Sequence, residues 1–337
     1  MKKHVNIPIF IPHYGCPNDC VFCNQRKITG KPSYSKDSVI NEIDTALSTV
    51  DTENSSVELA FFGGSFTAIP RNEMLGLLEI SDRYIKSGAI SGVRLSTRPD
   101  AISEEILDIL ACHGVKTIEL GLQSFSDKVL SASRRGHTAL DSEKACRLIK
   151  QRGFTLIGQM MVGLPLSTVE DEINTARSIC ALGCDGARVY PTVVFPDTRL
   201  MEMTKSGSYT PLTTEAAVER TAEVLSVFAD NGVRVIRIGL CSNETLRDPV
   251  YEGSYHPSVG ELSLNRFYLK KMTEKLSKMP DTLGKTVVFS VSKGKISQAV
   301  GQKRYNVLRI KEIFKLKDVK IKENDDLREF DLSADIS

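Results

Sequence analysis

The sequence predicts an α/β protein built on a full or partial parallel βα barrel, six-stranded, with a small basic α+β extension at its C-terminal end. Apolar, strand-like runs alternate with amphipathic, helix-like runs from residue 5 to residue 240, in six or seven successive units. This alternation is typical of parallel strands with their helices outside, because right-handed crossovers return each strand beside the one before it. We therefore expect the chemistry at the carboxyl ends of the strands.

The elements follow one another in a regular order. Seven short apolar runs are candidate strands, at residues 5–11, 57–62, 93–97, 117–122, 155–162, 187–192 and 233–239. The segments between them carry apolar residues at spacings of three and four, and several begin with a Ser or Thr in the N-cap position. These candidate helices span residues 37–50, 71–86, 103–113, 140–152, 168–182 and 214–230.

Charge divides the chain into two expected regions, a barrel at residues 1–240 and an accessory region at residues 241–337. Between residues 261 and 323 there are 16 Lys and Arg against 6 Asp and Glu, a net charge of +10 in a chain whose total is +2. Such a segment can contact the phosphates of a nucleic acid, or it can be an ordinary solvated surface. Charge alone leaves both interpretations open.

Composition excludes several classes of protein. With 337 residues, 41% of them hydrophobic and 26% charged, the chain can bury a full core. Its longest apolar runs, at 57–62 and 287–291, fall far short of the ~20 residues that cross a bilayer, so we expect no membrane partner. The N-terminal run contains two prolines and lacks a small-residue cleavage site, which indicates a strand rather than a signal peptide. The expected location is cytoplasmic.

In a reducing compartment, thiols bind metal or pack in the core more often than they form disulfides, and the spacing of the eight cysteines separates these two uses. Three of them lie within eight residues, whereas the others are scattered through segments with helical or strand patterning. We interpret the scattered cysteines as core residues, since free cysteine is among the most buried residue types. They are Cys112, Cys146, Cys180, Cys184 and Cys241.

Cys16, Cys20 and Cys23 form a C-x3-C-x2-C triplet directly after the first expected strand. Three thiolates are one ligand short of a closed structural zinc site. A 4Fe-4S cluster held by three thiolates leaves one iron open to the amino and carboxylate groups of a ligand, and low-potential electrons delivered there can cleave a sulfonium. A catalytic zinc with an open position is the alternative that the spacing alone leaves open.

Further motifs occur in order along the chain. They are Phe62-Gly63-Gly64-Ser65-Phe66, residues 95–100 (LSTRPD), 119–124 (ELGLQS), 135–138 (RGHT) and 190–192 (YPT). With the cysteine triplet, they resemble the radical S-adenosylmethionine superfamily, and in order and spacing they resemble the radical domain of the Elongator complex catalytic subunit over roughly residues 5–240. Agreement with oxygen-independent coproporphyrinogen oxidase is looser.

The resemblance implies a 4Fe-4S cluster on Cys16, Cys20 and Cys23 and S-adenosylmethionine as cofactors, with an electron donor such as flavodoxin or ferredoxin. It implies reductive cleavage of S-adenosylmethionine to a 5′-deoxyadenosyl radical. It also implies contacts to the ribose hydroxyls and the methionine carboxylate, from side chains able to make them. These are Ser96, Gln123, Arg135 and Gln159.

Some of these residues have simpler interpretations beside the functional one. Gly63 and Gly64 can bring the backbone close to the amino group of methionine, or they can form a plain turn at the end of a strand. Arg135 can instead be a surface residue, as its neighbour Arg134 suggests. Phe22 can cover the adenine or pack as an ordinary aromatic.

The leading function hypothesis is a radical enzyme that modifies RNA, with transfer RNA as its partner. The alternatives are a radical enzyme acting on a small-molecule or porphyrin-like substrate and a non-catalytic, metal-stabilised binding protein. The Elongator subunit also carries an acetyltransferase domain and a basic N-terminal extension, and we expect neither of them in residues 1–337. His256, just before the basic segment, is a candidate substrate-side acid, although a lone His beside a proline is more often structural.

Overall fold

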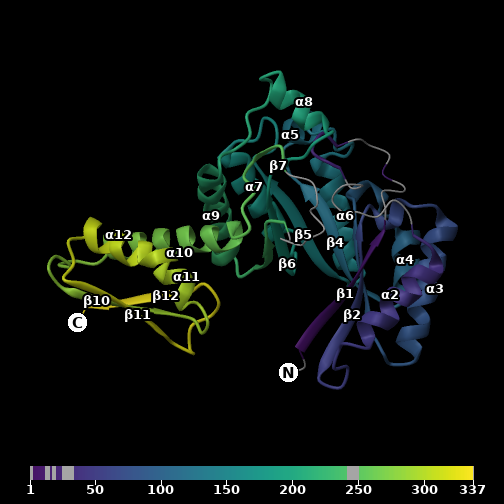
Figure 1. Ribbon diagram of the computed structural model, residues 1–337, viewed down its shortest axis with the longest axis horizontal. Coiled ribbons are helices and arrows are strands. Elements are labelled where there is room, and N and C mark those ends of the chain that lie inside the picture. Colours follow the sequence, from purple (N-terminus) through teal and green to yellow (C-terminus); the bar gives the residue numbers. More distant parts are fainter. Residues whose placement is uncertain (1–2, 12–15, 17–19, 25–33, 241–249, 337) are drawn as a thin grey trace.

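Seven strands form one parallel sheet in the order β1-β2-β3-β4-β5-β6-β8, and the connecting helices cover its outer face (Figure 1). The computed structural model describes residues 3–11, 16, 20–24, 34–240 and 250–336. The strands are β1 (Lys3–Ile11), β2 (Ser55–Gly63), β3 (Gly92–Thr97), β4 (Val115–Gln123), β5 (Thr155–Val162), β6 (Gly186–Pro191) and β8 (Arg234–Ile238). The predicted barrel is therefore confirmed as an open, curled half-barrel, with seven strands rather than six.

The helices begin where the sequence places polar caps. The side chains of Ser35, Ser103, Thr138, Thr168 and Thr213 each accept a hydrogen bond from a backbone N–H of the following first turn. The helices of this region are α2 (Lys36–Leu47), α3 (Arg71–Lys86), α4 (Glu104–Cys112), α5 (Asp127–Ala132), α6 (Ala139–Gln151), α7 (Val169–Ala181), α8 (Arg199–Lys205) and α9 (Thr214–Asp230).

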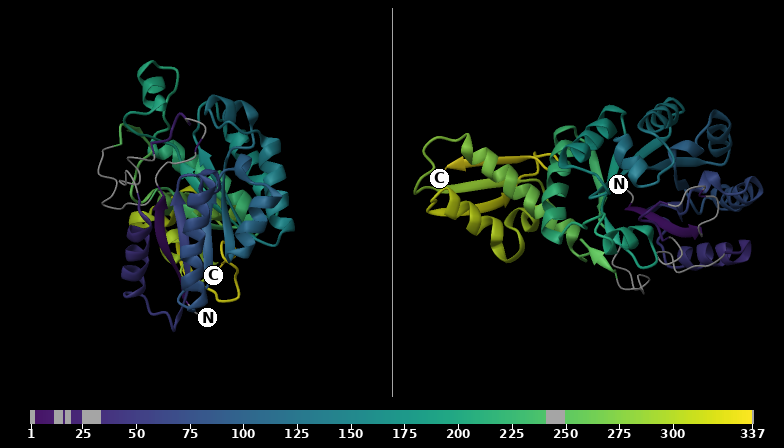
Figure 2. Two further views of the ribbon diagram at one scale, coloured as in Figure 1. Left: turned by 90° about the vertical axis from the view of Figure 1, so that its right-hand side faces the viewer. Right: turned by 90° about the horizontal axis from the view of Figure 1, so that it is seen from above.

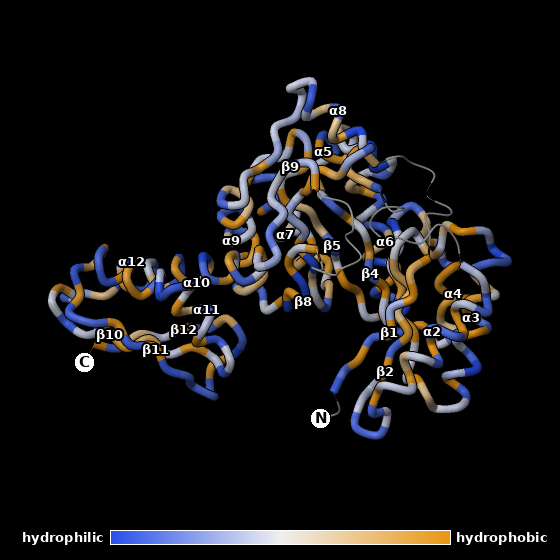
Figure 3. Tube along the Cα trace, in the orientation of Figure 1, coloured by the Kyte–Doolittle hydropathy of each residue, from blue (hydrophilic) through white to orange (hydrophobic). Residues whose placement is uncertain are grey.

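Alternate residues of the strands face opposite sides of the sheet. Side chains such as Leu59, Leu95 and Val189 face the helices and form the main hydrophobic core. Figure 3 shows the resulting mixture of hydrophobic and hydrophilic residues along the strands. The polar residues between them face the concave side, and the carboxyl ends of all seven strands meet at one edge (Figure 2).

A second unit lies beside α9 and has its own hydrophobic cluster around Phe267 and Phe289. Its three-stranded sheet has the order β11-β10-β12, and its helices lie on one face of that sheet. In the view of Figure 1 this face is the upper one, and the carboxyl ends of the half-barrel strands also lie at the top. The elements are α10 (Val259–Ser277), β10 (Thr286–Val291), α11 (Ile296–Val300), α12 (Tyr305–Ile313), β11 (Asp318–Glu323) and β12 (Leu332–Ile336). The expected α+β extension is present. The domain boundary at residue 240 stays a prediction, because α9 contributes to both clusters, Phe228 to one and Leu225 to the other.

The scattered cysteines only partly follow the expectation of burial. Cys146 and Cys184 are buried, Cys180 is half-buried, and Cys112 is exposed. Cys112 is the last residue of α4, off the buried stripe of that helix, so its assignment to the core was wrong. Cys241 lies outside the described residues. Among the described helices, none has the length and apolar composition needed to cross a bilayer.

Candidate active site at the cysteine loop

The cysteine loop is anchored at the carboxyl edge of the half-barrel by contacts on two sides. The backbone N–H of Val21 donates to the carbonyl of Ser133, which follows α5, at 3.2 Å, and the carbonyl of Val21 accepts from the N–H of Leu200 at 2.8 Å. The Asn24 side chain donates to the carbonyl of Pro196 at 3.0 Å. The segment between β6 and α9, which contains α8, therefore holds the loop from one side.

Hydrophobic packing reinforces this anchor. Val21 is fully buried in a small cluster with Val194, Leu200 and Tyr209, and Phe22 packs against the same cluster. The Tyr209 hydroxyl donates to the carbonyl of Gly163 at 2.7 Å, tying the cluster to the end of β5. The structure thus supports the packing interpretation of Phe22, and its contact with adenine stays a prediction.

Two of the cysteine thiols lie beside hydrogen-bond donors. Sγ of Cys16 is 3.3 Å from the Ser65 hydroxyl and 3.9 Å from Nη1 of Arg98. Sγ of Cys20, a buried residue, accepts from Nη1 of Arg135 at 3.3 Å. Both sulfurs therefore have a guanidinium group as a neighbour, a donor suited to a ligand sulfur.

Arg98 links this environment together, and sequence reasoning assigned it no role. Its side chain is 1% exposed, and its Nε donates to Oδ1 of Asp100 at 2.5 Å. Its Nη2 donates to the carbonyl of Arg135. Burial opposes the charge, but the hydrogen bond and the charge of Asp100 outweigh it and raise the pKa of Arg98 above its ordinary value. Arg98 is therefore a fixed cation that positions both Cys16 and the Arg135 loop.

Arg135, Gln123 and Gln159 come together at the ends of β4 and β5. Nη2 of Arg135 donates to the carbonyl of Gly121 at 2.7 Å, and Nε2 of Gln159 lies 3.5 Å from Oε1 of Gln123. A Cβ at Gly121 would lie 3.3 Å from Nη2 of Arg135, so glycine leaves the room that the guanidinium occupies. Arg135 is 7% exposed, so the alternative of a surface arginine is wrong.

Backbone geometry directs Gln123 into the site. The register between β4 and β5 shifts between Gly121 and Gln123, and Gln123 has a φ of 66°. A positive φ is uncommon for a side chain with a Cβ and often marks functional positions. The predicted Ser96 is half-buried on β3. Whether these residues bind S-adenosylmethionine stays a prediction.

Gly63 has a packing reason that the sequence prediction did not include. Its φ is +110°, and a Cβ there would lie much closer than 3.0 Å to the carbonyl oxygen of Ile11. The same carbonyl accepts from the N–H of Gly64 at 3.3 Å. The end of β1, from which the cysteine loop leaves, is thus in close backbone contact with the Gly63-Gly64 turn.

His137 is a buried neutral side chain behind the site. It is 5% exposed, and its Nε2 lies 3.4 Å from the carbonyl of Leu122. Burial and the nearby charge of Arg135 lower the pKa of His137 to about 4. The ring is therefore uncharged at neutral pH.

Charged residues close the floor of the concave side, toward the amino ends of the strands. Arg94 donates to Glu58 at 3.1 Å and to Glu119 at 2.9 Å, while Nε of Arg188 lies 2.7 Å from Glu119. The Arg188 guanidinium lies 5.4 Å from the centroid of the Phe62 ring. These side chains form one ion-pair network across β2, β3, β4 and β6.

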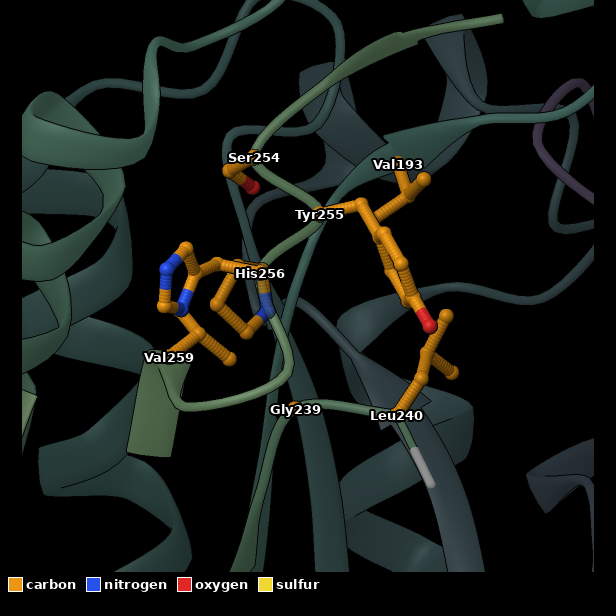
Figure 4. A pocket seen from close by; sticks show the side chains of 8 residues that line it. Val193, Gly239, Leu240, Ser254, Tyr255, His256 and Val259 are labelled. Carbon is orange, nitrogen blue, oxygen red and sulfur yellow. The ribbon is translucent and has the colours of Figure 1, made fainter. Parts of the chain in front are cut away.

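A small pocket lies where β6 and β8 end, and Figure 4 shows His256 and Tyr255 on its wall. The His256 ring points toward Val259, away from Tyr255 (Figure 4). Its Nδ1 accepts from the N–H of Ser258 at 3.0 Å, next to the start of α10. This bond gives His256 a structural role, and its role as a substrate-side acid stays a prediction.

The donor set at the cysteine loop suits a 4Fe-4S cluster, because such clusters are held by cysteine thiolates. A hydroxyl and two guanidinium groups lie beside Sγ of Cys16 and Sγ of Cys20, and donors near ligand sulfurs orient them and stabilise their charge. Among the described residues, no group of three Cys, His, Asp or Glu side chains is placed to hold a single metal ion.

Comparison with known families and proteins gives consistent matches. The pattern of the radical SAM superfamily matches residues 10–179, and that of a radical SAM C-terminal domain matches residues 184–271. An uncharacterized protein of Methanocaldococcus jannaschii is 30% identical over 222 residues, which cover 63% of this chain and 68% of that protein. Human Elongator complex protein 3 is 28% identical over 232 residues, covering 62% of this chain and 41% of its own length.

Two proteins of Methanocaldococcus infernus are also similar to this chain. The tRNA uridine(34) acetyltransferase of Methanocaldococcus infernus is 30% identical over 171 residues, covering 50% of this chain and 31% of that protein. The solved structure of the archaeal Elp3 from M. infernus with an N-terminal deletion superposes with a TM-score of 0.61 at 20% identity, covering 86% of this chain and 71% of that one. The structural match supports the fold. The chain spans about two fifths of the length of the eukaryotic Elongator relatives.

Proposed function

Because the chain belongs to the radical S-adenosylmethionine superfamily, whose pattern covers residues 10–179, we propose that it cleaves S-adenosylmethionine reductively to modify RNA. It is an enzyme of this class, with a 4Fe-4S cluster and S-adenosylmethionine as cofactors. Bound together, these cofactors supply a 5′-deoxyadenosyl radical. Family membership argues against the alternative of a non-catalytic binding protein.

One observation carries the placement of the cluster, namely that two buried arginines and a serine meet the cysteine loop. Cys16, Cys20 and Cys23 would hold the cluster, with Arg135 beside Cys20 and Ser65 beside Cys16. Donors near ligand sulfurs stabilise the charge of the cluster and orient its ligands. The hydrophobic contacts of the loop with the α8 segment would keep water from this side of it.

The binding of S-adenosylmethionine would use the strand ends next to the cluster. The backbone at Gly63 and Gly64 would meet the amino group of methionine, and Arg135 would pair with its carboxylate. Gln123 and Gln159 each have an amide that can donate to and accept from ribose hydroxyls, and the hydroxyl of Ser96 can do the same.

Gly64→Val should abolish S-adenosylmethionine binding and leave the cluster absorbance intact, because a branched side chain would fill the ligand's space. Unchanged affinity, measured by equilibrium dialysis, would remove the turn from the site.

We propose transfer RNA as the substrate, on the strength of the similarity to Elongator complex protein 3 and to the archaeal tRNA uridine(34) acetyltransferase. In the basic C-terminal unit, the turn between α11 and α12 exposes Lys303 and Arg304, which form no ion pair with other described residues. Two other members of the predicted basic stretch are paired, Lys295 with Glu329 and Arg309 with Glu312. The unpaired turn is therefore the part of that stretch best suited to phosphate contacts.

Two expectations accompany this proposal. An electron donor such as flavodoxin or ferredoxin would reduce the cluster, since no other redox group is implied by the family. The cytosol would be the compartment, where Cys146 and Cys184 remain free thiols, as they are in the structure.

The decisive test is product formation under anaerobic conditions. Protein with reconstituted cluster, S-adenosylmethionine and a chemical reductant should release 5′-deoxyadenosine, measured by chromatography, and Cys20→Ala should release none. Absence of this product from the parent protein would contradict the proposal.

The substrate is tested separately. Transfer RNA from a strain lacking the gene, compared nucleoside by nucleoside with that of the parent strain, should lack one modification. Unchanged transfer RNA would favour a small-molecule or porphyrin-like substrate.

A further inference from the structure

The last two strands of the half-barrel, β6 and β8, carry donor groups that the proposed cofactor site does not use. Arg188 and Tyr190 lie on the concave face of β6, and Arg188 is the register partner of Arg237 on β8. A register shift between Ala187 and Arg188 makes Ile236 an extra residue in β8. This bulge turns Arg237 to the concave side, beside Arg188.

Both Tyr190 and Arg237 keep donors that their contacts with the described residues do not use. Nη1 of Arg188 donates to the Tyr190 oxygen at 3.3 Å, so the hydrogen of the phenol remains to be donated elsewhere. Arg237 uses Nε for the carbonyl of Gly239 at 3.1 Å. Its two terminal nitrogens bond to none of the described residues. Burial raises the pKa of Tyr190, which keeps the phenol protonated, and the charge of Arg237 is near enough to act on it.

The charges on this wall do not balance. Glu58 and Glu119 neutralise Arg94 and Arg188 in the floor. Arg237 is half-buried and has no acidic partner among the described residues. A cation that is partly removed from water, beside a phenol donor, favours an anionic ligand that accepts from both.

This anion is not expected to belong to S-adenosylmethionine. The residues assigned to that cofactor lie at the ends of β2 to β5, next to the cysteine loop that follows β1. β6 pairs with β5, where Gln159 is the register partner of Arg188, and β8, which carries Arg237, lies one strand further from the cysteine loop, at the edge of the sheet. A ligand group held there would come from a second molecule.

We propose that Arg237 and Tyr190 bind a phosphate of the substrate RNA beside the nucleotide that is modified, an inference that rests on the proposed function. The guanidinium and the phenol O–H would each donate to phosphate oxygens. Arg188 is a positioning residue, because it holds the phenol oxygen and is itself fixed by Glu119. Contact with a phosphate would set the depth to which the nucleotide enters the half-barrel.

The test compares two arginines on one strand. Arg237→Gln should weaken the binding of an anticodon stem-loop RNA by about tenfold, as expected for loss of one charge-assisted contact. It should also lower the slope of log affinity against log salt by about 1. Arg234→Gln is the matched control, since Arg234 is at the amino end of β8 with 72% of its side chain exposed, and it should change neither quantity.

Two further variants separate binding from folding. Arg237→Lys keeps the charge and should restore the salt slope, and Tyr190→Phe should weaken binding while leaving that slope unchanged. All variants should bind S-adenosylmethionine as the parent does. If the parent binds the stem-loop and Arg237→Gln binds it equally well, the inference is overturned and the proposed function stands. If the parent shows no RNA binding, the RNA assignment itself fails, and the phosphate site fails with it.

Discussion

Replacing Gly63 by alanine should destabilise the protein far more than the same change at another glycine of positive φ. Gly63 has a φ of +110°, and a Cβ there would lie inside 3.0 Å of the Ile11 carbonyl oxygen, a separation that real side chains essentially never show. The backbone strain costs of order 1–3 kcal/mol. Moving the Ile11 carbonyl also breaks its hydrogen bond to the N–H of Gly64, worth about 1 kcal/mol. We expect a total loss of about 3 kcal/mol of unfolding free energy from these two terms.

The control is Gly88→Ala. Gly88 has a φ of +76°, and nothing lies within 4 Å of the position of its Cβ. Only the left-handed backbone penalty applies, about 1 kcal/mol. In urea unfolding at equal slope, the midpoint of Gly63→Ala should therefore shift about three times as far as that of Gly88→Ala. Equal shifts would refute the close approach of β1 to the Gly63-Gly64 turn.

Three other predictions concern the charges in and around the site. Burial and the charge of Arg135 lower the pKa of His137 to about 4 in the folded protein, whereas an ordinary histidine has a pKa of about 6.5. Between these two values the unfolded chain binds more protons than the folded protein, so the free energy of unfolding should fall as the pH falls through this window. His137→Gln should flatten that dependence in urea unfolding measured at pH values inside and above the window. Glu119→Ala leaves two buried guanidinium groups without their shared carboxylate, and calorimetry should show a loss of about 3–5 kcal/mol; a loss below about 1 kcal/mol would contradict the network. Replacing Lys303 and Arg304 together by Gln should weaken full-length transfer RNA binding and lower its salt slope by roughly 1 to 2, with substrate-free cofactor cleavage unchanged; unaltered RNA binding would make the turn a solvated surface.

Much of the fold follows from periodicity that the sequence displays directly. The strand at Thr155–Val162 and the helices at Arg71–Lys86 and Thr214–Asp230 have the predicted bounds, because each has regular spacing and clear ends. Residues 233–239 were a seventh candidate strand beside a barrel expected to have six, and β8 pairs with β6 and forms an edge of the sheet. Its bulge at Ile236 reverses the alternation, so the inward position of Arg237 was not predictable from a period of two.

The site was partly predictable for a similar reason. The cysteine triplet and the Gly63-Gly64 turn are local patterns, and the sequence displays them. Apart from Asp100, the partners of the buried Arg98 are distant in the sequence, namely Cys16 and the carbonyl of Arg135. An arginine gives no sign in the sequence that it will be buried. Cys112 was predicted to be buried and is exposed. The general tendency of cysteine to be buried does not determine whether a cysteine at the end of a helix faces the core or the solvent.

The assignment of a 4Fe-4S cluster to Cys16, Cys20 and Cys23 can be tested by counting the iron in protein handled without oxygen. Protein purified or reconstituted without oxygen should carry about four irons per chain and a charge-transfer band near ~400 nm, and Cys20→Ala should lose both. Cys112→Ala, at the exposed cysteine of α4, should keep both. One tightly bound zinc per chain in anaerobic protein, without that absorption, would show that the three cysteines hold zinc instead.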